Sequence, residues 1–182
     1  AAGVEPAVVD LEEASADDVG TAIDGCDAVV FAAGAGSNSG IERKDTVDRA
    51  GAILLADAAE RAGVGRYVLV SSMGVESVRD GATPDGVDEV FVAYLRAKLA
   101  AEDDLRGREL GWTVVRPGRL TDDDGTGRVL LAAHVDRGDI PRDDVASVVA
   151  AVLDDPRSAG HVLEVVSGST PVAEAVTQSI RG

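Results

Sequence analysis

The chain is predicted to adopt an α/β fold built on a parallel β-sheet, and two features of the sequence support this. Short apolar runs rich in β-branched residues alternate with longer stretches in which apolar residues recur every three or four positions. The spacing at which apolar residues recur, together with the length of each segment, identifies the short runs as strands and the longer stretches as helices. Strands and helices that alternate along a chain are typical of parallel sheets covered by helices.

Five strands are expected, each an apolar or β-branched run bounded by polar residues, Gly or Pro. The second of them, Ala28–Ala33, is apolar throughout and is predicted to be fully buried. The Gly-rich loop Gly34–Gly40 follows it and is expected to be a flexible rim. The five predicted strands are Glu5–Asp10, Ala28–Ala33, Tyr67–Ser71, Trp112–Arg116 and His161–Val166.

Helices are expected between these strands, where apolar residues fall on one face. Ser15 can cap the first helix, because Asp18 follows three residues later. The predicted helices run from Ser15 to about Asp24, over Glu42–Ala62 and Asp88–Arg106, from a cap at Asp143 or Asp144 through Leu153, and from a first turn that holds Pro171.

The composition predicts one folded domain, residues 1–182, that binds neither nucleic acid nor membranes. Hydrophobic residues make up 45% of the chain, which is enough for a packed core. The formal net charge is −16, without the cluster of Lys and Arg that a phosphate backbone requires. No apolar run approaches the roughly 18–20 residues of a membrane helix. The two His and one Cys show no metal-ligand spacing.

Charge and cysteine content indicate the environment of the protein. An acidic chain with only two Lys among its 17 basic residues resembles proteins of salt-loving microbes, whose cytoplasm screens such repulsion. The single cysteine, Cys26, permits no internal disulfide and is compatible with a reducing cytoplasm. We therefore expect a cytoplasmic protein that acts on a small molecule. Its oligomeric state is left open, with a homodimer as one option.

Tyr94 and Lys98 are the most informative pair in the sequence. Four residues apart on a predicted helix, their side chains lie on one face. An ammonium near the phenol stabilises the phenolate and is expected to lower the pKa of Tyr94 from about 10. A tyrosine tuned in this way can pass a proton to or from a hydroxyl or carbonyl oxygen. The alternative is a packed Tyr beside a solvated Lys.

The surroundings of this pair favour a ligand site. Val70, Ser71 and Ser72 end one predicted strand, and Arg116-Pro117-Gly118 ends the next. Open α/β sheets bind their ligands at the carboxyl ends of strands. The alternatives are that the two serines satisfy local backbone groups and that Arg116 or Arg119 is a structural ion-pair partner.

Five short motifs in this order resemble the short-chain dehydrogenase/reductase superfamily. The similarity is greatest to its atypical NAD(P)-binding branch, which includes NmrA-like sensors, flavin-reductase-like enzymes and relatives of NAD-dependent epimerase/dehydratases. It covers essentially the whole chain and implies a Rossmann-like, doubly wound, three-layer sheet. The motifs are Asp10-Leu11, Ala32-Ala33-Gly34, Val70-Ser71-Ser72, Tyr94-x-x-x-Lys98 and Arg116-Pro117-Gly118.

The resemblance implies a cofactor, NADP or NAD with NADP slightly favoured, and a role for each motif. Tyr94 would be the acid/base, Lys98 its partner on the nicotinamide ribose, and Ser72 an orienting group. Asp10 and Leu11 would lie by the adenine. The residues expected to bind the cofactor are Asp10, Leu11, Ala32, Ala33, Gly34, Val70, Ser71, Lys98, Arg116, Pro117, Gly118 and Arg119.

The chain departs from the family pattern at two places. The G-x-x-G-x-x-G fingerprint is absent. We therefore expect the chain to lack the first strand–helix–strand of the fold, to be incomplete at its N-terminus and to bind cofactor poorly by itself. Met73 stands where the family usually has its catalytic Ser or Thr, and Met cannot usefully hydrogen-bond a carbonyl.

Two functions follow as hypotheses. The first is an NAD(P)-dependent oxidoreductase or epimerase/dehydratase-like enzyme that uses Tyr94 tuned by Lys98. The second, which Met73 favours, is a non-catalytic NAD(P)-binding sensor or scaffold of the NmrA-like type.

Overall fold

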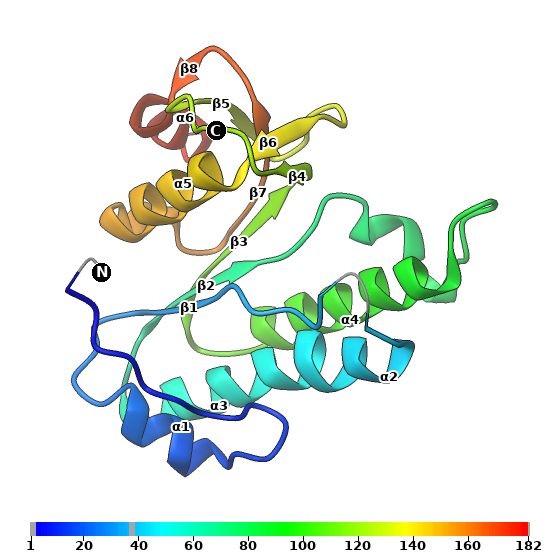
Figure 1. Ribbon diagram of the computed structural model, residues 1–182. Coiled ribbons are helices and arrows are strands. Elements are labelled where there is room, and N and C mark those ends of the chain that lie inside the picture. Colours follow the sequence, from blue (N-terminus) through cyan, green and yellow to red (C-terminus); the bar gives the residue numbers. More distant parts are fainter. Residues whose placement is uncertain (1–2, 37–38, 182) are drawn as a thin grey trace.

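The computed structural model describes residues 3–36 and 39–181. A six-stranded sheet with the order β1-β2-β3-β7-β5-β8 lies at its centre (Figure 1). The first four strands in this order are parallel, whereas β5 pairs antiparallel with both β7 and β8. The strands of this sheet are β1 (Val29–Phe31), β2 (Arg66–Val70), β3 (Gly111–Pro117), β5 (Arg128–Ala132), β7 (His161–Ser167) and β8 (Thr170–Pro171).

Helices cover both faces of the sheet, which confirms the three-layer α/β architecture (Figure 1). One face carries α1 (Ala16–Ala22), α3 (Ala52–Ala62) and α4 (Glu89–Arg106), and the other carries α5 (Arg142–Asp154) and α6 (Val172–Ser179). No helix among the described residues is long and apolar enough to span a bilayer. The remaining elements are α2 (Ile41–Arg43), the π-helix η1 (Lys44–Gly51), the 3-10 helices η2 (Val75–Gly81) and η3 (Pro156–Ser158), and a separate parallel pair, β4 (Arg119–Thr121) with β6 (Asp139–Pro141).

The core consists of two apolar layers, one on each face of the sheet. On β2, Tyr67 and Leu69 pack into the layer beneath α3 and α4, whereas Val68 between them packs into the layer beneath α5. This alternation follows from the two-residue period of a strand. Each fully buried Val or Leu side chain contributes about 1.5–3 kcal/mol. The sheet is therefore fixed from both sides.

Two of the predicted helix starts are confirmed, and one is wrong. Ser15 accepts a hydrogen bond from the Asp18 amide, and the Asp18 carboxylate accepts one from the Ser15 amide, so α1 begins with a capping box. The helix predicted to begin at about Asp88 is α4, and the Asp88 carboxylate caps it by accepting hydrogen bonds from the Val90 and Phe91 amides. Asp144 does not cap α5, because its carboxylate accepts hydrogen bonds from the Thr126 and Gly127 amides instead. At α5 and α6 the N-cap position is held by Pro141 and Pro171.

The first predicted strand, Glu5–Asp10, is not a strand. Its backbone has no sheet partner among the described residues, and Val8 is 99% exposed. The strand Ala28–Ala33 shrinks to the three residues of β1, which pairs only with β2. Val30 is consequently 38% exposed, so the prediction of a fully buried strand is also wrong.

The expected count of five strands is too low, because β4, β5, β6 and β8 were not predicted. Three of these have two or three residues each, which is too short for a periodic signal. The sheet is mixed rather than purely parallel, since β5 runs against its neighbours. Residues 37–38 of the expected flexible rim lie outside the described residues.

The long helix predicted over Glu42–Ala62 forms, but Lys44–Gly51 has π-helical rather than α-helical geometry. Single π turns inside helices often occur at functional sites. Gly51 ends this segment against the Phe31 ring, where a Cβ atom would come within 3.3 Å of a ring carbon. The buried residues of η1 include the two charged side chains Lys44 and Asp48.

We expect Gly168→Ala to lower the free energy of unfolding by about 1–3 kcal/mol, because the added Cβ would overlap the backbone of Val129 and Leu130. Gly20→Ala is the matched control. Nothing lies within 4 Å of its Cβ position inside α1, so this variant should gain about 0.5–1 kcal/mol. Urea unfolding of both variants checks this prediction, and equal effects would contradict it.

Candidate functional site

The candidate site lies at the carboxyl ends of β1 and β2, where α4 and η1 meet them. Lys98 of α4 is 3% exposed and its Nζ lies 3.2 Å from Oδ1 of Asp48, which is 1% exposed. The same ammonium donates to the carbonyls of Ala33 and Val70, at 3.3 Å each. The three donors of Lys98 thus face three oxygen atoms contributed by η1, β2 and the end of β1.

Asp48 was missed by the sequence analysis. Its Oδ2 accepts a hydrogen bond of 3.1 Å from the Ala35 amide, and a Cβ on Gly34 would stand 3.0 Å from its Oδ1. Oδ1 is buried and forms the ion pair without a well-directed hydrogen bond. A signal was available, because Asp48 follows Val47 on the predicted apolar face of its helix. A carboxylate at the edge of such a face is costly unless it has a partner.

The Lys98 ammonium does not contact the Tyr94 hydroxyl in the way that the spacing of the two residues suggested. The Lys98 ammonium lies over the phenol ring, 5.8 Å from its centroid, and no hydrogen bond joins the two side chains. Burial raises the pKa of Tyr94, and a hydrogen bond with Ser72 only partly opposes this. The expected lowering of the Tyr94 pKa by Lys98 is therefore wrong, because the ammonium is turned toward Asp48.

The chain's other lysine also lies against Tyr94. Lys44 is 5% exposed, and its Nζ stands 5.7 Å from the Tyr94 ring centroid while it donates to the Gly36 carbonyl at 2.5 Å. Both lysines of the chain therefore flank one tyrosine. Burial lowers the pKa of Lys98, Asp48 opposes this shift, and Lys44 adds to it. Phe91, one turn earlier on α4, stacks on Tyr94 with the ring centroids 5.7 Å apart.

Ser71 and Arg116 belong to a separate buried network. The Ser71 hydroxyl donates to Glu102 at 2.5 Å, and Arg116, 2% exposed, donates to both carboxylate oxygens of Glu102. Arg116 also donates to Glu76. A hydrogen bond from Arg79 lowers the pKa of Glu76 to about 2, with Arg116 adding to this effect against the opposing effect of burial.

The remaining predicted residues are spread more widely. The exposed Asp10 accepts a hydrogen bond from the Glu12 amide, Leu11 packs near Gly51, and the exposed Arg119 pairs with Asp139. Ala32 is exposed beside the cluster. Pro117 accepts a hydrogen bond from the Met73 amide, which brings the ends of β2 and β3 together. The predicted residues that the structure gathers around Lys98 are Ala33, Gly34, Val70, Ser72 and Tyr94.

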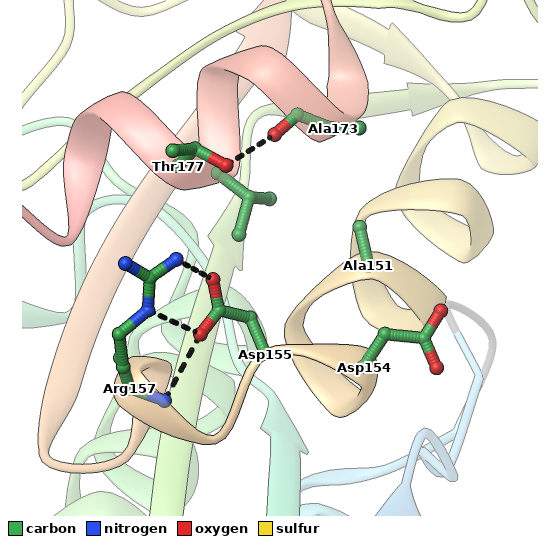
Figure 2. Close-up of a pocket in the computed structure, with 7 residues that line it drawn as sticks. Ala151, Asp154, Asp155, Arg157, Ala173 and Thr177 are labelled. Carbon is green, nitrogen blue, oxygen red and sulfur yellow. Dashed lines mark hydrogen bonds and ion pairs between the residues drawn. The ribbon is translucent and has the colours of Figure 1, made fainter.

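Two shallow hollows lie away from this cluster. One, of about 360 Å³, lies between α5 and α6 and is lined by Ala151, Thr177 and the Asp155–Arg157 ion pair (Figure 2). The other, of about 440 Å³, includes Asp10. No group of three or more His, Cys, Asp or Glu within the described ranges is placed to hold a metal ion.

Comparison with known proteins shows consistent similarities. A family model described as NAD(P)H-binding matches residues 1–156. The "uncharacterized sugar epimerase YhfK" of Bacillus subtilis is 36% identical over 176 residues, which cover 97% of this chain and 79% of that protein. A putative NAD-dependent epimerase/dehydratase from Bacillus halodurans superposes with a TM-score of 0.83 at 36% identity, covering 94% of this chain and 76% of that one. The oxidoreductase ylbE from Lactococcus lactis superposes with a TM-score of 0.82 at 25% identity, covering 97% and 78%.

We expect Asp48→Asn to lower the free energy of unfolding at neutral pH by about 3–5 kcal/mol, because it leaves the buried Lys98 ammonium without its counter-charge. Burial already holds the pKa of Lys98 below its usual value of 10.5. The unfolded chain therefore binds more protons than the folded one between these two pKa values, and stability rises with pH in that window. The variant lowers the folded pKa further, so part of its deficit should disappear as the pH rises toward 10.5.

Asp45→Asn is the matched control, since Asp45 forms an exposed ion pair with Arg49 on the same helical segment. It should cost less than about 1 kcal/mol. Urea unfolding at neutral and alkaline pH measures both variants. A loss that is equal in the two variants, or that does not change with pH, would contradict the prediction.

Proposed function

The chain belongs to the NAD(P)H-binding family, and on that premise we propose that it is an NAD(P)-dependent reductase or epimerase-like enzyme whose acid/base residue is Tyr94. We propose a small molecule as its substrate and NADP(H) as its preferred cofactor. The observation that carries this proposal is that the ammonium groups of Lys44 and Lys98 both lie over the Tyr94 ring, 5.7 and 5.8 Å from its centroid, at the carboxyl edge of the sheet.

The residues around Lys98 fit the nicotinamide end of a dinucleotide. The contacts of its ammonium, 3.2 and 3.3 Å long, exceed the 2.7–2.9 Å that is typical of strong charge-assisted bonds. Asp48 Oδ1 is a buried acceptor without a well-directed donor. A ribose hydroxyl could accept a hydrogen bond from the Lys98 ammonium without the loss of a strong one. Its own proton could be donated to Asp48 Oδ1. When bound, NADPH or NADH supplies a hydride.

Tyr94 is suited to donating a proton. Because burial raises its pKa, the hydroxyl is protonated at neutral pH and can give its proton to an oxygen that becomes negative during reduction. The phenolate left behind would have two ammonium groups within 5.8 Å of its ring centroid, and their positive charge would favour its formation at that moment. Ser72, whose hydroxyl donates to the Met73 carbonyl at 3.1 Å, lies beside Tyr94 and would orient the Tyr94 hydroxyl. Asp48 is a positioning residue, because it acts by holding Lys98.

The alternative, a non-catalytic NAD(P)-binding sensor or scaffold, is favoured by Met73. Its thioether cannot supply the hydroxyl that would hold a substrate carbonyl. Stoichiometric binding of NADPH, without its oxidation by a panel of carbonyl compounds, quinones and flavins, would support this alternative over the enzyme.

We expect Tyr94→Phe to reduce turnover by about 10²–10⁴-fold and to leave the affinity for the cofactor nearly unchanged, because the hydroxyl supplies a proton and not a binding contact. Calorimetric titration with NADPH and NADH in concentrated KCl measures affinity. The rate of NADPH oxidation with the same substrate panel measures turnover.

Tyr67→Phe is the matched control, because Tyr67 is the other tyrosine and its buried hydroxyl donates to the Ala52 carbonyl at 2.9 Å, away from the cluster. This variant should lose about 1 kcal/mol of stability and keep its activity. Full turnover in Tyr94→Phe would rule out the proposed acid/base role. Failure of the wild-type chain to bind either cofactor would contradict the proposed function.

A further inference from the structure

The guanidinium of Arg137 lies at the carboxyl edge of the sheet without a partner among the described residues. Within the described residues it forms no ion pair and no hydrogen bond, and it is exposed. Apart from Arg181 near the C-terminus, every other arginine there donates to a carboxylate or to a backbone or hydroxyl oxygen. Most arginines of this acidic chain pair with a carboxylate in the described part of the structure, whereas Arg137 does not.

The position of this guanidinium is defined by Gly74. Nη2 of Arg137 lies 3.0 Å from the point where a Cβ on Gly74 would stand. Gly74 has a φ of +90°, a conformation that favours glycine. Gly74 comes two residues after Ser72, so their Cα atoms are at most about 7 Å apart. Arg137 therefore lies beside the segment that follows β2, two residues beyond Ser72.

The loop that carries Arg137 is fixed on both sides. Before it, the Val135 amide donates to Glu164 of β7 at 3.0 Å. After it, the Gly138 carbonyl accepts a hydrogen bond from the Arg119 amide at 2.9 Å, and Gly138 packs on Val166. The backbone on either side is thus held, and this limits the conformational entropy that ligand binding would cost.

Arg137 is also placed between the ends of two strands. Gly138 abuts Gly118, which leaves no room there for a Cβ, and the Met73 amide donates to the Pro117 carbonyl at 3.0 Å. The segments after β2 and β3 and the loop before β6 therefore converge around this guanidinium. Ligands of open α/β sheets bind at this edge.

We propose, on the basis of the reductase function inferred above, that Arg137 binds an anionic oxygen group of the substrate, a carboxylate or a phosphate. The planar guanidinium can donate two parallel hydrogen bonds to such a group. The substrate class is thus a carbonyl compound that also carries a carboxylate or phosphate, with the anion on Arg137 and the carbonyl toward Ser72 and Tyr94.

Phenylglyoxal labelling of the wild-type chain, followed by peptide mass spectrometry, tests the binding step without any turnover. We expect 4-oxopentanoate, inorganic phosphate or both to slow the labelling of Arg137. Methyl 4-oxopentanoate, which lacks the charge, should not slow it, and Arg181 should label at the same rate throughout. Protection by one anion alone identifies that anion as the group recognised.

Three results would overturn the proposal. The first is that neither anion protects Arg137, and the second is that the methyl ester protects it as well as the acid does. The third is that NADPH alone protects it fully, which would place the guanidinium on the cofactor instead. Because this readout needs no catalysis, it stands even where the proposed reductase function fails.

The kinetic consequence is tested with Arg137→Gln. We expect the KM for the anionic carbonyl compound that Arg137 recognises to rise by about tenfold or more. The KM for its methyl ester and the affinity for NADPH should change little. Arg61→Gln is the control, because it removes one charge from an exposed ion pair with Asp17 far from this edge. Equal effects of the two variants, or equal effects on acid and ester, would contradict the assignment.

Discussion

The buried ion pair between Lys98 and Asp48 is the constraint on which the site depends. Bringing an ammonium to 3% exposure is costly, and the charge is tolerated only because a carboxylate and two carbonyls surround it. These partners come from η1, from β2 and from the end of β1. The pair therefore joins the helix that carries Tyr94 to the strand ends that would hold a cofactor.

A second polar network lies one helical turn further along α4. Glu102 follows Lys98 by four residues and accepts hydrogen bonds from Ser71 and Arg116. The last residue of β2 and the residue after it are thus bound by adjacent turns of α4, because the Val70 carbonyl contacts Lys98 and the Ser71 hydroxyl contacts Glu102. Glu102 also opposes the lowering of the Lys98 pKa by burial. The end of β2 is consequently held on its buried side, and the hydroxyl of Ser72, which follows it, donates to the Met73 carbonyl at 3.1 Å.

Local patterns predicted the longer helices and the strands β1, β2, β3 and β7, but they missed β4, β5, β6 and β8, whose pairing depends on tertiary contacts. The spacing of Tyr94 and Lys98 placed both on one helix face, but which group the ammonium would face depended on Asp48, distant in sequence. Glu5–Asp10 has the composition of a strand, yet a strand exists only where a neighbour completes its hydrogen bonds. The antiparallel β5 was not predicted either, and its partners β7 and β8 are distant from it in sequence.

The charge distribution explains how so acidic a chain can offer a site for anions. Most of its arginines are neutralised by nearby carboxylates, whereas Lys44 donates to a carbonyl and Arg137 has no partner among the described residues. The net charge of −16 repels anions at long range, but this field is screened beyond about 10 Å at 0.1 M salt and about 3 Å at 1 M. Direct hydrogen bonds from these cations act at contact distance and are screened far less. High salt would thus remove the repulsion while the contacts at the carboxyl edge persist.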